Sequence, residues 1–100
     1  MPKRVFIATR NLLFRATLGA AVGAAGGEVV ADAAGCDLAV VEVEPPDAVD
    51  RIRGFVAGGI PVLAYGPHVR AELLRAARDA GATAVPNSEV ERELRALVAG

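Results

Sequence analysis

The sequence predicts a small three-layer α/β protein built around a five-stranded parallel sheet. Short apolar runs alternate with helical patterns along its 100 residues, which is the signature of βαβ units. One of these runs, Leu38 to Val43, is almost wholly aliphatic, as expected of a strand that is buried on both faces. Right-handed crossovers between such strands lead to the sheet order 2-1-3-4-5. The whole chain, residues 1–100, is therefore expected to form a single domain.

Five strands and four helices account for the alternation. The predicted strands span residues 5–8, 28–31, 38–43, 60–65 and 83–86. The predicted helices span residues 11–25, 47–57 and 69–80, and a last one begins near residue 88. Only six residues, Ala31 to Cys36, separate the second strand from the third. This segment is too short for a crossover helix, so we expect a bare loop there.

Each predicted helix has an apolar stripe and signals at its ends. Asp47 is placed to cap the second helix, and Ser88 and Glu91 have the spacing of a capping box at the last one. Gly81 ends the third helix. The residues expected to face inward are Phe14, Leu18, Ala21, Val22 and Ala25 in the first helix; Val49, Ile52 and Val56 in the second; Val69, Leu73, Ala76, Ala77 and Ala80 in the third; and Val90, Leu94, Leu97 and Val98 in the last.

Composition and charge exclude several classes of protein. The formal net charge is −1 with no block of like charge, so the electrostatic footprint of a nucleic-acid binder is missing. The only Cys, Cys36, cannot form an internal disulfide, and one Cys with one His argues against a zinc site. Arg10 ends the N-terminal apolar run, and the weakly polar stretch from Leu12 to Ala25 is shorter than the roughly 20 residues that cross a bilayer. We therefore expect a cytoplasmic protein with no membrane contact, metal or cofactor.

Three segments resemble the receiver domain of bacterial response regulators. DLAVVEVEPP (37–46) is similar to the receiver strand that ends in the phosphoacceptor Asp and is followed by a proline-containing loop. IPVLAYGPH (60–68) is similar to the strand that ends in a Thr or Ser, and AARDAGATAVPNS (76–88) to the receiver's helix, A-G-A turn and last strand. The similarity runs over nearly the whole chain. It implies a flavodoxin-like (CheY-like) fold, with the second crossover helix missing or reduced, and a role in signal transduction.

The residues that carry receiver chemistry are replaced in this sequence. Where the resemblance places two metal-binding acids after the first strand, the chain has Thr9 and Arg10. Glu42 stands at the phosphoacceptor position, Gly66 at that of the switch Thr, and Ser88 at that of the receiver's Lys. Phosphotransfer needs Mg²⁺, which is bound chiefly by carboxylate oxygens. The resemblance therefore implies a pseudo-receiver without catalytic residues, acting as a phosphorylation-independent interaction or signalling module.

The carboxyl edge of the sheet is the place where a ligand is expected to bind. Arg10 and Glu42 are expected to pair there, with the arginine replacing the metal, or else to point separately into water. The other residues expected along this edge are Asn11, Glu44, His68 and Asn87.

A small-anion or nucleotide-binding protein, or an uncharacterised enzyme, is the alternative function. Thr9, Arg10 and Asn11 lead into a helix N-terminus, which favours phosphate or carboxylate, and His68 and Ser88 could add donors. The simpler explanation is that Ser88 serves only as a helix cap, as its spacing from Glu91 indicates, and that His68 is an exposed loop residue. The sequence has no glycine-rich nucleotide motif and no nucleophile elbow.

Two surfaces are candidates for protein contacts. On the first helix, Leu12, Ala16, Gly19 and Gly23 lie opposite the core stripe, and the small residues would let another helix approach closely. The alternative is that these small residues reflect only the alanine- and glycine-rich composition of the chain and expose little apolar area. The receiver resemblance nominates the face formed by the last two helices and the strand between them. On the residues alone, the mixed charges of those helices form solvated pairs at i,i+3 and i,i+4. The partner is unknown, and a homodimer through either surface is the expectation.

Overall fold

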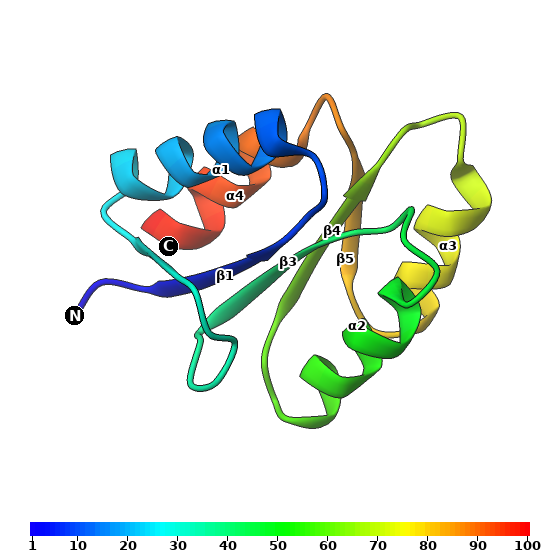
Figure 1. Ribbon diagram of the computed structural model, residues 1–100, viewed down its shortest axis with the longest axis horizontal. Coiled ribbons are helices and arrows are strands. Elements are labelled where there is room, and N and C mark those ends of the chain that lie inside the picture. Colours follow the sequence, from blue (N-terminus) through cyan, green and yellow to red (C-terminus); the bar gives the residue numbers. More distant parts are fainter.

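A five-stranded parallel sheet lies between two layers of helices in the computed structural model, which describes all residues from Met1 to Gly100 (Figure 1). The sheet order is β2-β1-β3-β4-β5, so the predicted fold class and strand order are confirmed. The strands are β1 (Arg4–Ala8), β2 (Glu28–Val30), β3 (Leu38–Glu42), β4 (Val62–Gly66) and β5 (Thr83–Pro86). The helices are α1 (Leu12–Ala24), α2 (Ala48–Ala57), α3 (Ala71–Asp79) and α4 (Val90–Ala99). None of these helices has the length and apolar character needed to cross a membrane.

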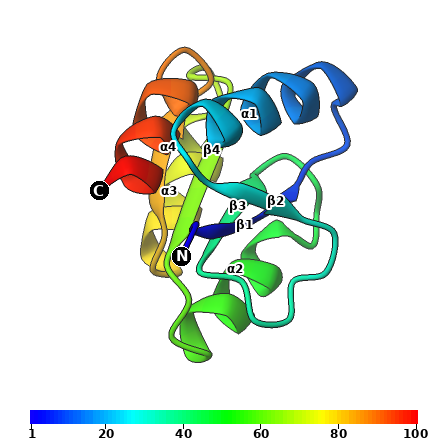
Figure 2. The same cartoon turned by 90° about the vertical axis from the view of Figure 1, so that its left-hand side faces the viewer.

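The four helices divide equally between the two faces of the sheet (Figure 2). Successive residues of a strand point to opposite faces, so each strand contributes to two cores. Beneath α1 and α4, Leu18 and Leu94 pack against Val40 and other strand residues. Beneath α2 and α3, Ile52 and Leu74 pack against the opposite face of the same strands.

The connection between β2 and β3, residues 31–37, contains turns and bends but no helix (Figure 2). The predicted bare loop is therefore confirmed. Asp37 fixes the end of this loop to β1, because its carboxylate accepts a hydrogen bond of 2.9 Å from the backbone N–H of Arg4. Because the connection contains no helix, the face of β1 on the side of α2 has no helix directly over it.

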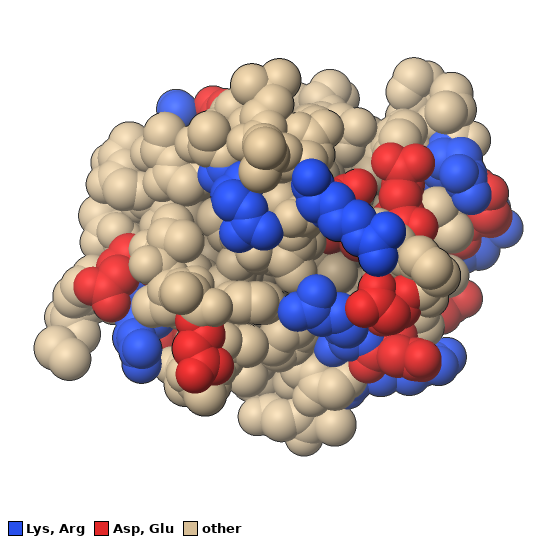
Figure 3. Space-filling view, in the orientation of Figure 1, with Lys and Arg blue, Asp and Glu red and all other residues tan.

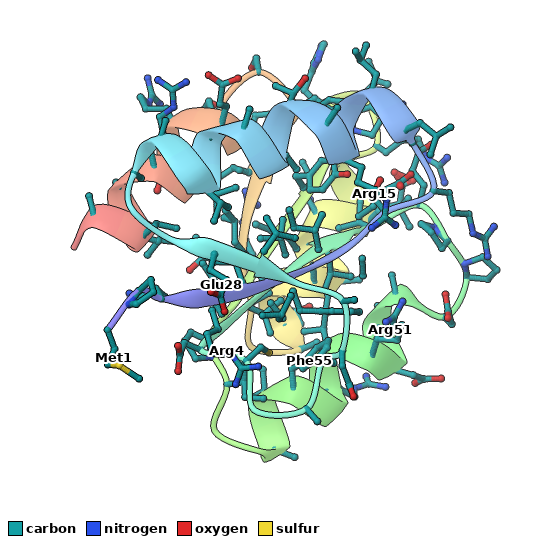
Figure 4. The ribbon with its side chains drawn as sticks, turned by 60° about the vertical axis from the view of Figure 1, so that its left-hand side comes forward. Met1, Arg4, Arg15, Glu28, Arg51 and Phe55 are labelled. Carbon is teal, nitrogen blue, oxygen red and sulfur yellow. The ribbon has the colours of Figure 1, made fainter.

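Side chains from α2 reach across to cover part of this face. The rings of Phe6 and Phe55 pack at a centroid distance of 6.1 Å, and the guanidinium carbon of Arg51 lies 5.7 Å from the centre of the Phe6 ring. Figure 4 shows Arg51 and Phe55 on the same side of α2, directed toward β1. Such a cation–π contact stabilises by roughly 0.5–1 kcal/mol at an exposed site.

The third helix begins later than the sequence predicts. A turn closed by a 2.9 Å hydrogen bond from the Arg70 N–H to the Pro67 carbonyl precedes it, and α3 starts at Ala71. Val69 therefore lies in the turn with 73% of its surface exposed, so the prediction that it faces the core is wrong. The buried residues of α3 are Leu74 and Ala77, and Leu74 was not among the residues expected to face inward.

The predicted side-chain caps of α2 and α4 are absent. Glu89, not Ser88, is the N-cap residue of α4, and neither it nor Asp47 at α2 makes a side-chain capping hydrogen bond. The prediction of a capping box formed by Ser88 and Glu91 is therefore wrong. Val56 and Leu97 were also expected to face inward, but they lie at the margins of their helical stripes and are 38% and 37% exposed.

Candidate functional site

The predicted edge residues meet where the parallel strands end. Thr9 follows β1, Glu42 ends β3, and Gly66 ends β4 beside β5. The Thr9 hydroxyl donates a hydrogen bond of 2.6 Å to Glu42 Oε1, and the Asn87 backbone N–H donates one of 2.8 Å to the Gly66 carbonyl. The expectation that these residues share one edge is confirmed.

The Glu42 carboxylate is held by uncharged donors. Besides the Thr9 hydroxyl, the backbone N–H of Arg10 donates to Glu42 Oε1 at 3.0 Å. Thr9 is 8% exposed, and its hydroxyl oxygen also accepts a 3.1 Å hydrogen bond from the Asn11 N–H. Three consecutive residues after β1 are thereby linked to the end of β3. Hydrogen bonds to a charged group typically stabilise by about 1.5–3 kcal/mol each.

The predicted pairing of the Arg10 and Glu42 side chains is wrong. Their charged groups make no ion pair, and the Arg10 side chain is exposed. The turn from β1 into α1 instead directs the Arg10 backbone N–H at the carboxylate. The arginine whose side chain hydrogen-bonds to this turn is Arg15, which the sequence analysis passed over. Its Nη2 donates to the Thr9 carbonyl at 2.7 Å and its Nη1 to the Ile7 carbonyl at 3.4 Å.

Gly66 is closed to a side chain by its neighbour. A Cβ atom at this position would lie 2.4 Å from Val43 Cγ2, well inside van der Waals contact. Val43 is 4% exposed and β-branched, so it has little freedom to move away. The space that a hydroxyl-bearing side chain would need at the end of β4 is therefore occupied by Val43.

The remaining predicted ligand residues do not converge. Asn11 caps α1, since its Oδ1 accepts a 3.0 Å hydrogen bond from the Phe14 N–H. Glu44 lies 4.0 Å from Arg70 in an exposed ion pair. His68 and Ser88 are exposed on separate loops. No three His, Cys, Asp or Glu side chains are grouped so that they could hold a metal ion.

Two polar atoms beside this edge are buried without a hydrogen-bond partner, the Tyr65 hydroxyl and Asn87 Oδ1. Tyr65 is paired with Glu42 across β3 and β4, and its ring packs 5.1 Å from that of Phe14. Burial raises the pKa of Tyr65 to about 12, and the Glu42 charge adds to the rise. The nearby Thr9 hydroxyl opposes this rise, although it already donates to Glu42 and is not in hydrogen-bond geometry with the phenol.

A pocket of about 340 Å³ adjoins the Glu42 end of the edge. Thr9, Arg10 and Glu42 are among its walls, together with Arg15 and Arg51, which the sequence analysis did not select. None of Asn11, Glu44, Gly66, His68, Asn87 and Ser88 borders it. On the face of the molecule in Figure 3, several Lys and Arg side chains lie around the middle, with acidic side chains among and beside them.

Comparison with known proteins identifies the fold. No protein-family model matches the chain, and no curated protein matches its sequence. A response regulator from Thermotoga maritima matches its structure with a TM-score of 0.79 at 15% identity, over 100% of both chains. The chemotaxis response regulator CheY4 of Vibrio cholerae matches with a TM-score of 0.76 at 16% identity, over 97% of this chain and 96% of that chain. NtrX from Brucella abortus matches with a TM-score of 0.80 at 15% identity, over 97% of this chain and 26% of that chain. The chain therefore has the response regulator receiver (CheY-like) fold.

Proposed function

We propose that this chain is a cytoplasmic, receiver-like signalling module that acts through protein contacts and independently of phosphorylation. The fold supports the signalling part, since proteins of the same architecture include a chemotaxis response regulator. Fold alone does not carry function, so the proposal depends on the residues at the carboxyl edge.

The state of Glu42 is the observation that carries the proposal. An acid that accepts a phosphoryl group needs a bound cation beside it, to offset the charge of the transferred group. Here Thr9 and Arg10 stand in place of acids, and the carboxylate is engaged by the Thr9 hydroxyl and the Arg10 N–H. Val43 in turn excludes a side chain at Gly66. The site therefore supports a fixed structural link between β1 and β3, in place of a reversible phosphorylation switch.

The exposed surface of α1 is the favoured contact surface. Its first turn exposes Leu12 and Leu13 by 78% and 75%, and Arg15 is the only charged residue of the helix. Figure 3 shows an extended surface without charged side chains over α1. The alternative surface, on α3, β5 and α4, carries charges that already pair within α4, such as Arg95 with Glu91 at 3.0 Å. An uncharged surface costs less to desolvate on association than a charged one.

A thermal melt with Mg²⁺ and beryllofluoride, a phosphoryl mimic, tests the loss of phosphorylation chemistry. Binding to the folded state must raise the melting temperature by mass action, by roughly 10 °C or more for a ligand at about 100 times its Kd. We expect no rise with either component or with both together. A rise that requires both would show that the receiver site is functional, and would contradict the proposal.

Sedimentation of the protein over a range of concentrations tests the contact surface. We expect a homodimer that Ala20→Glu, on the exposed side of α1, dissociates. Ala96→Glu, on the exposed side of α4, is the matched control and should leave the dimer intact. A monomer at every concentration would remove the homodimer from the proposal, and a dimer sensitive only to Ala96→Glu would move the contact to the other surface.

A further inference from the structure

The pocket beside β1 lies where the crossover helix between β2 and β3 is missing. Its floor includes Phe6 and Ala8 of β1 with Val41 of β3, three residues that point to the same face of the sheet. Ala31, at the start of the bare loop, lies on its rim, and α2 closes one side. The missing helix has thus left apolar sheet surface lining a cavity of about 340 Å³. This volume is at the lower end of the range for small-molecule sites, which is roughly 300–1,000 Å³.

Three arginines from three elements line this pocket. Arg10 follows β1, Arg15 belongs to α1 and Arg51 belongs to α2. Figure 4 shows Arg15 and Arg51 on the same side of the molecule, one from α1 and the other from α2. None of the three has a carboxylate within ion-pair distance, as is also true of Arg75 and Arg78 outside the pocket. The other arginines are paired: Arg4, Arg53, Arg92 and Arg95 with one acid each, and Arg70 with two.

Two of the three pocket arginines, Arg15 and Arg51, are held in place while keeping free donors. Two carbonyl oxygens accept from Arg15, which leaves further N–H groups of its guanidinium available. The Arg51 guanidinium lies over the Phe6 ring, and its side chain makes no hydrogen bond. Two acids also border the pocket: Glu42 is already engaged by Thr9 and Arg10, and Asp47 makes no ion pair. The formal charge of the lining is therefore positive by one unit.

We propose that this pocket binds a small organic anion, in which a carboxylate or phosphate is attached to a flat apolar group. The acidic group would be held by Arg10, Arg15 and Arg51, because guanidinium groups bind carboxylate and phosphate through paired hydrogen bonds. The apolar group would lie on the pocket floor, against the accessible parts of Phe6, Ala8 and Val41. This inference goes beyond the proposed function, and it assigns anion binding to the vacated helix position instead of the edge near His68 and Ser88.

Titration with four probes tests the chemistry of the ligand. Benzoate and phenyl phosphate carry both the ring and the acidic group, inorganic phosphate lacks the ring, and benzyl alcohol lacks the charge. Binding is measured by calorimetry and by amide chemical shifts of the pocket residues. We expect benzoate, phenyl phosphate or both to bind at least about tenfold more tightly than the other two probes. The ratio of the dissociation constants of benzoate and phenyl phosphate then distinguishes a carboxylate ligand from a phosphate ligand. Equal binding of inorganic phosphate or of benzyl alcohol would overturn the proposal, as would no binding of any probe up to about 10 mM.

Paired arginine variants test the location. Arg51→Met keeps the apolar stem of the side chain but removes its charge. It should lower the affinity for the more tightly bound of benzoate and phenyl phosphate by about tenfold. Arg53→Met is the matched control on the same helix, outside the pocket, and should change the affinity by less than about twofold. If Arg51→Met does not fold, Arg10→Met serves in its place, because that side chain is exposed. Unchanged affinity in the folded pocket variant, or an equal loss in Arg53→Met, would overturn the proposal. Either failure leaves the proposed protein contacts untouched, because those depend on α1.

Discussion

The face of the sheet under α1 and α4 is packed with branched and aromatic side chains, whereas the face under α2 and α3 is packed largely with alanine. The eleven buried residues of the first core include no alanine. Seven of the twelve in the second core are alanines: Ala8, Ala39, Ala48, Ala64, Ala77, Ala82 and Ala84. The second face has also lost a helix and contains the pocket. The difference suggests a division of roles, in which the first face supplies most of the stability and the second supplies space for binding.

Leucine-to-alanine substitutions in the helices test this division most strongly. Leu94→Ala in α4 should lower the free energy of unfolding by about 4 kcal/mol, because it opens a cavity in a core of large side chains. Leu74→Ala in α3 should lower the free energy of unfolding by about 3 kcal/mol. Leu74 is slightly less buried than Leu94, and its neighbours are mostly small, so the substitution removes fewer contacts. Denaturant unfolding measures both values. A larger loss for Leu74→Ala would contradict the assignment of stability to the first face.

Alkaline pH should weaken the first face through Tyr65. The pKa of Tyr65 is raised from 10.0 to about 12, so between these values the unfolded chain has lost the phenol proton while the folded protein keeps it. The free energy of unfolding should therefore be unaffected by this group below pH 10, and should fall by about 1.4 kcal/mol per pH unit between pH 10 and about pH 12. Tyr65→Phe is the control: it should remove that part of the pH dependence. It should also be neutral or slightly stabilising near pH 7, because the hydroxyl has no partner. An equal alkaline loss in both proteins would contradict the raised pKa.

Gly66→Ala tests the contact that closes the end of β4 on the second face. The added Cβ would meet Val43 Cγ2 at 2.4 Å, so we expect a loss of about 2 kcal/mol from overpacking. In a Val43→Ala background the same change should cost markedly less, and a double-mutant cycle of unfolding free energies measures this coupling. Additive effects of the two substitutions would show that Val43 is not what excludes a side chain at Gly66.

Helix caps should show the smallest difference between the faces. Asn11 caps α1 through its side chain, so Asn11→Ala should cost about 1 kcal/mol. Asp47 stands at the N-cap of α2 but makes no capping hydrogen bond, so Asp47→Ala should stay within about 0.5 kcal/mol of the wild type. Thermal melts of the two variants make the comparison. Equal losses would mean that the two faces do not differ in how their helices are capped.

The architecture could be predicted from the sequence because it depends on periodicity and connection length. The aliphatic run of β3 and the six residues from Ala31 to Cys36 were sufficient for the buried strand and the bare loop. The start of α3 could not be predicted in the same way. An apolar residue such as Val69 fits a helical stripe, but the turn that excludes it depends on a backbone hydrogen bond to Pro67.

The sequence was sufficient to predict which residues lie at the carboxyl edge of the sheet, but not which of their groups contact one another. Parallel strands bring Thr9 and Glu42 to one edge whatever their side chains, and the structure places them there. Which group of Arg10 meets the carboxylate depends on how the chain turns into α1, and the backbone N–H does so. Arg15 and Arg51 carry no local signal, because they come together only through the packing of α1 and α2 around the vacated helix position.

Phosphotransfer from acetyl phosphate tests the central claim, that this receiver fold has lost its phosphoacceptor chemistry. The protein and its Glu42→Asp variant are incubated with acetyl phosphate and Mg²⁺, and intact mass is measured with CheY4 of Vibrio cholerae treated in parallel. We predict no phosphoryl adduct, which would add about 80 Da, on either protein, because an aspartate at position 42 still has Thr9 and Arg10 beside it, and neither side chain supplies a carboxylate to bind Mg²⁺. An adduct on Glu42→Asp alone would place the block at the acceptor residue. A Mg²⁺-dependent adduct on the unmodified sequence would contradict the claim.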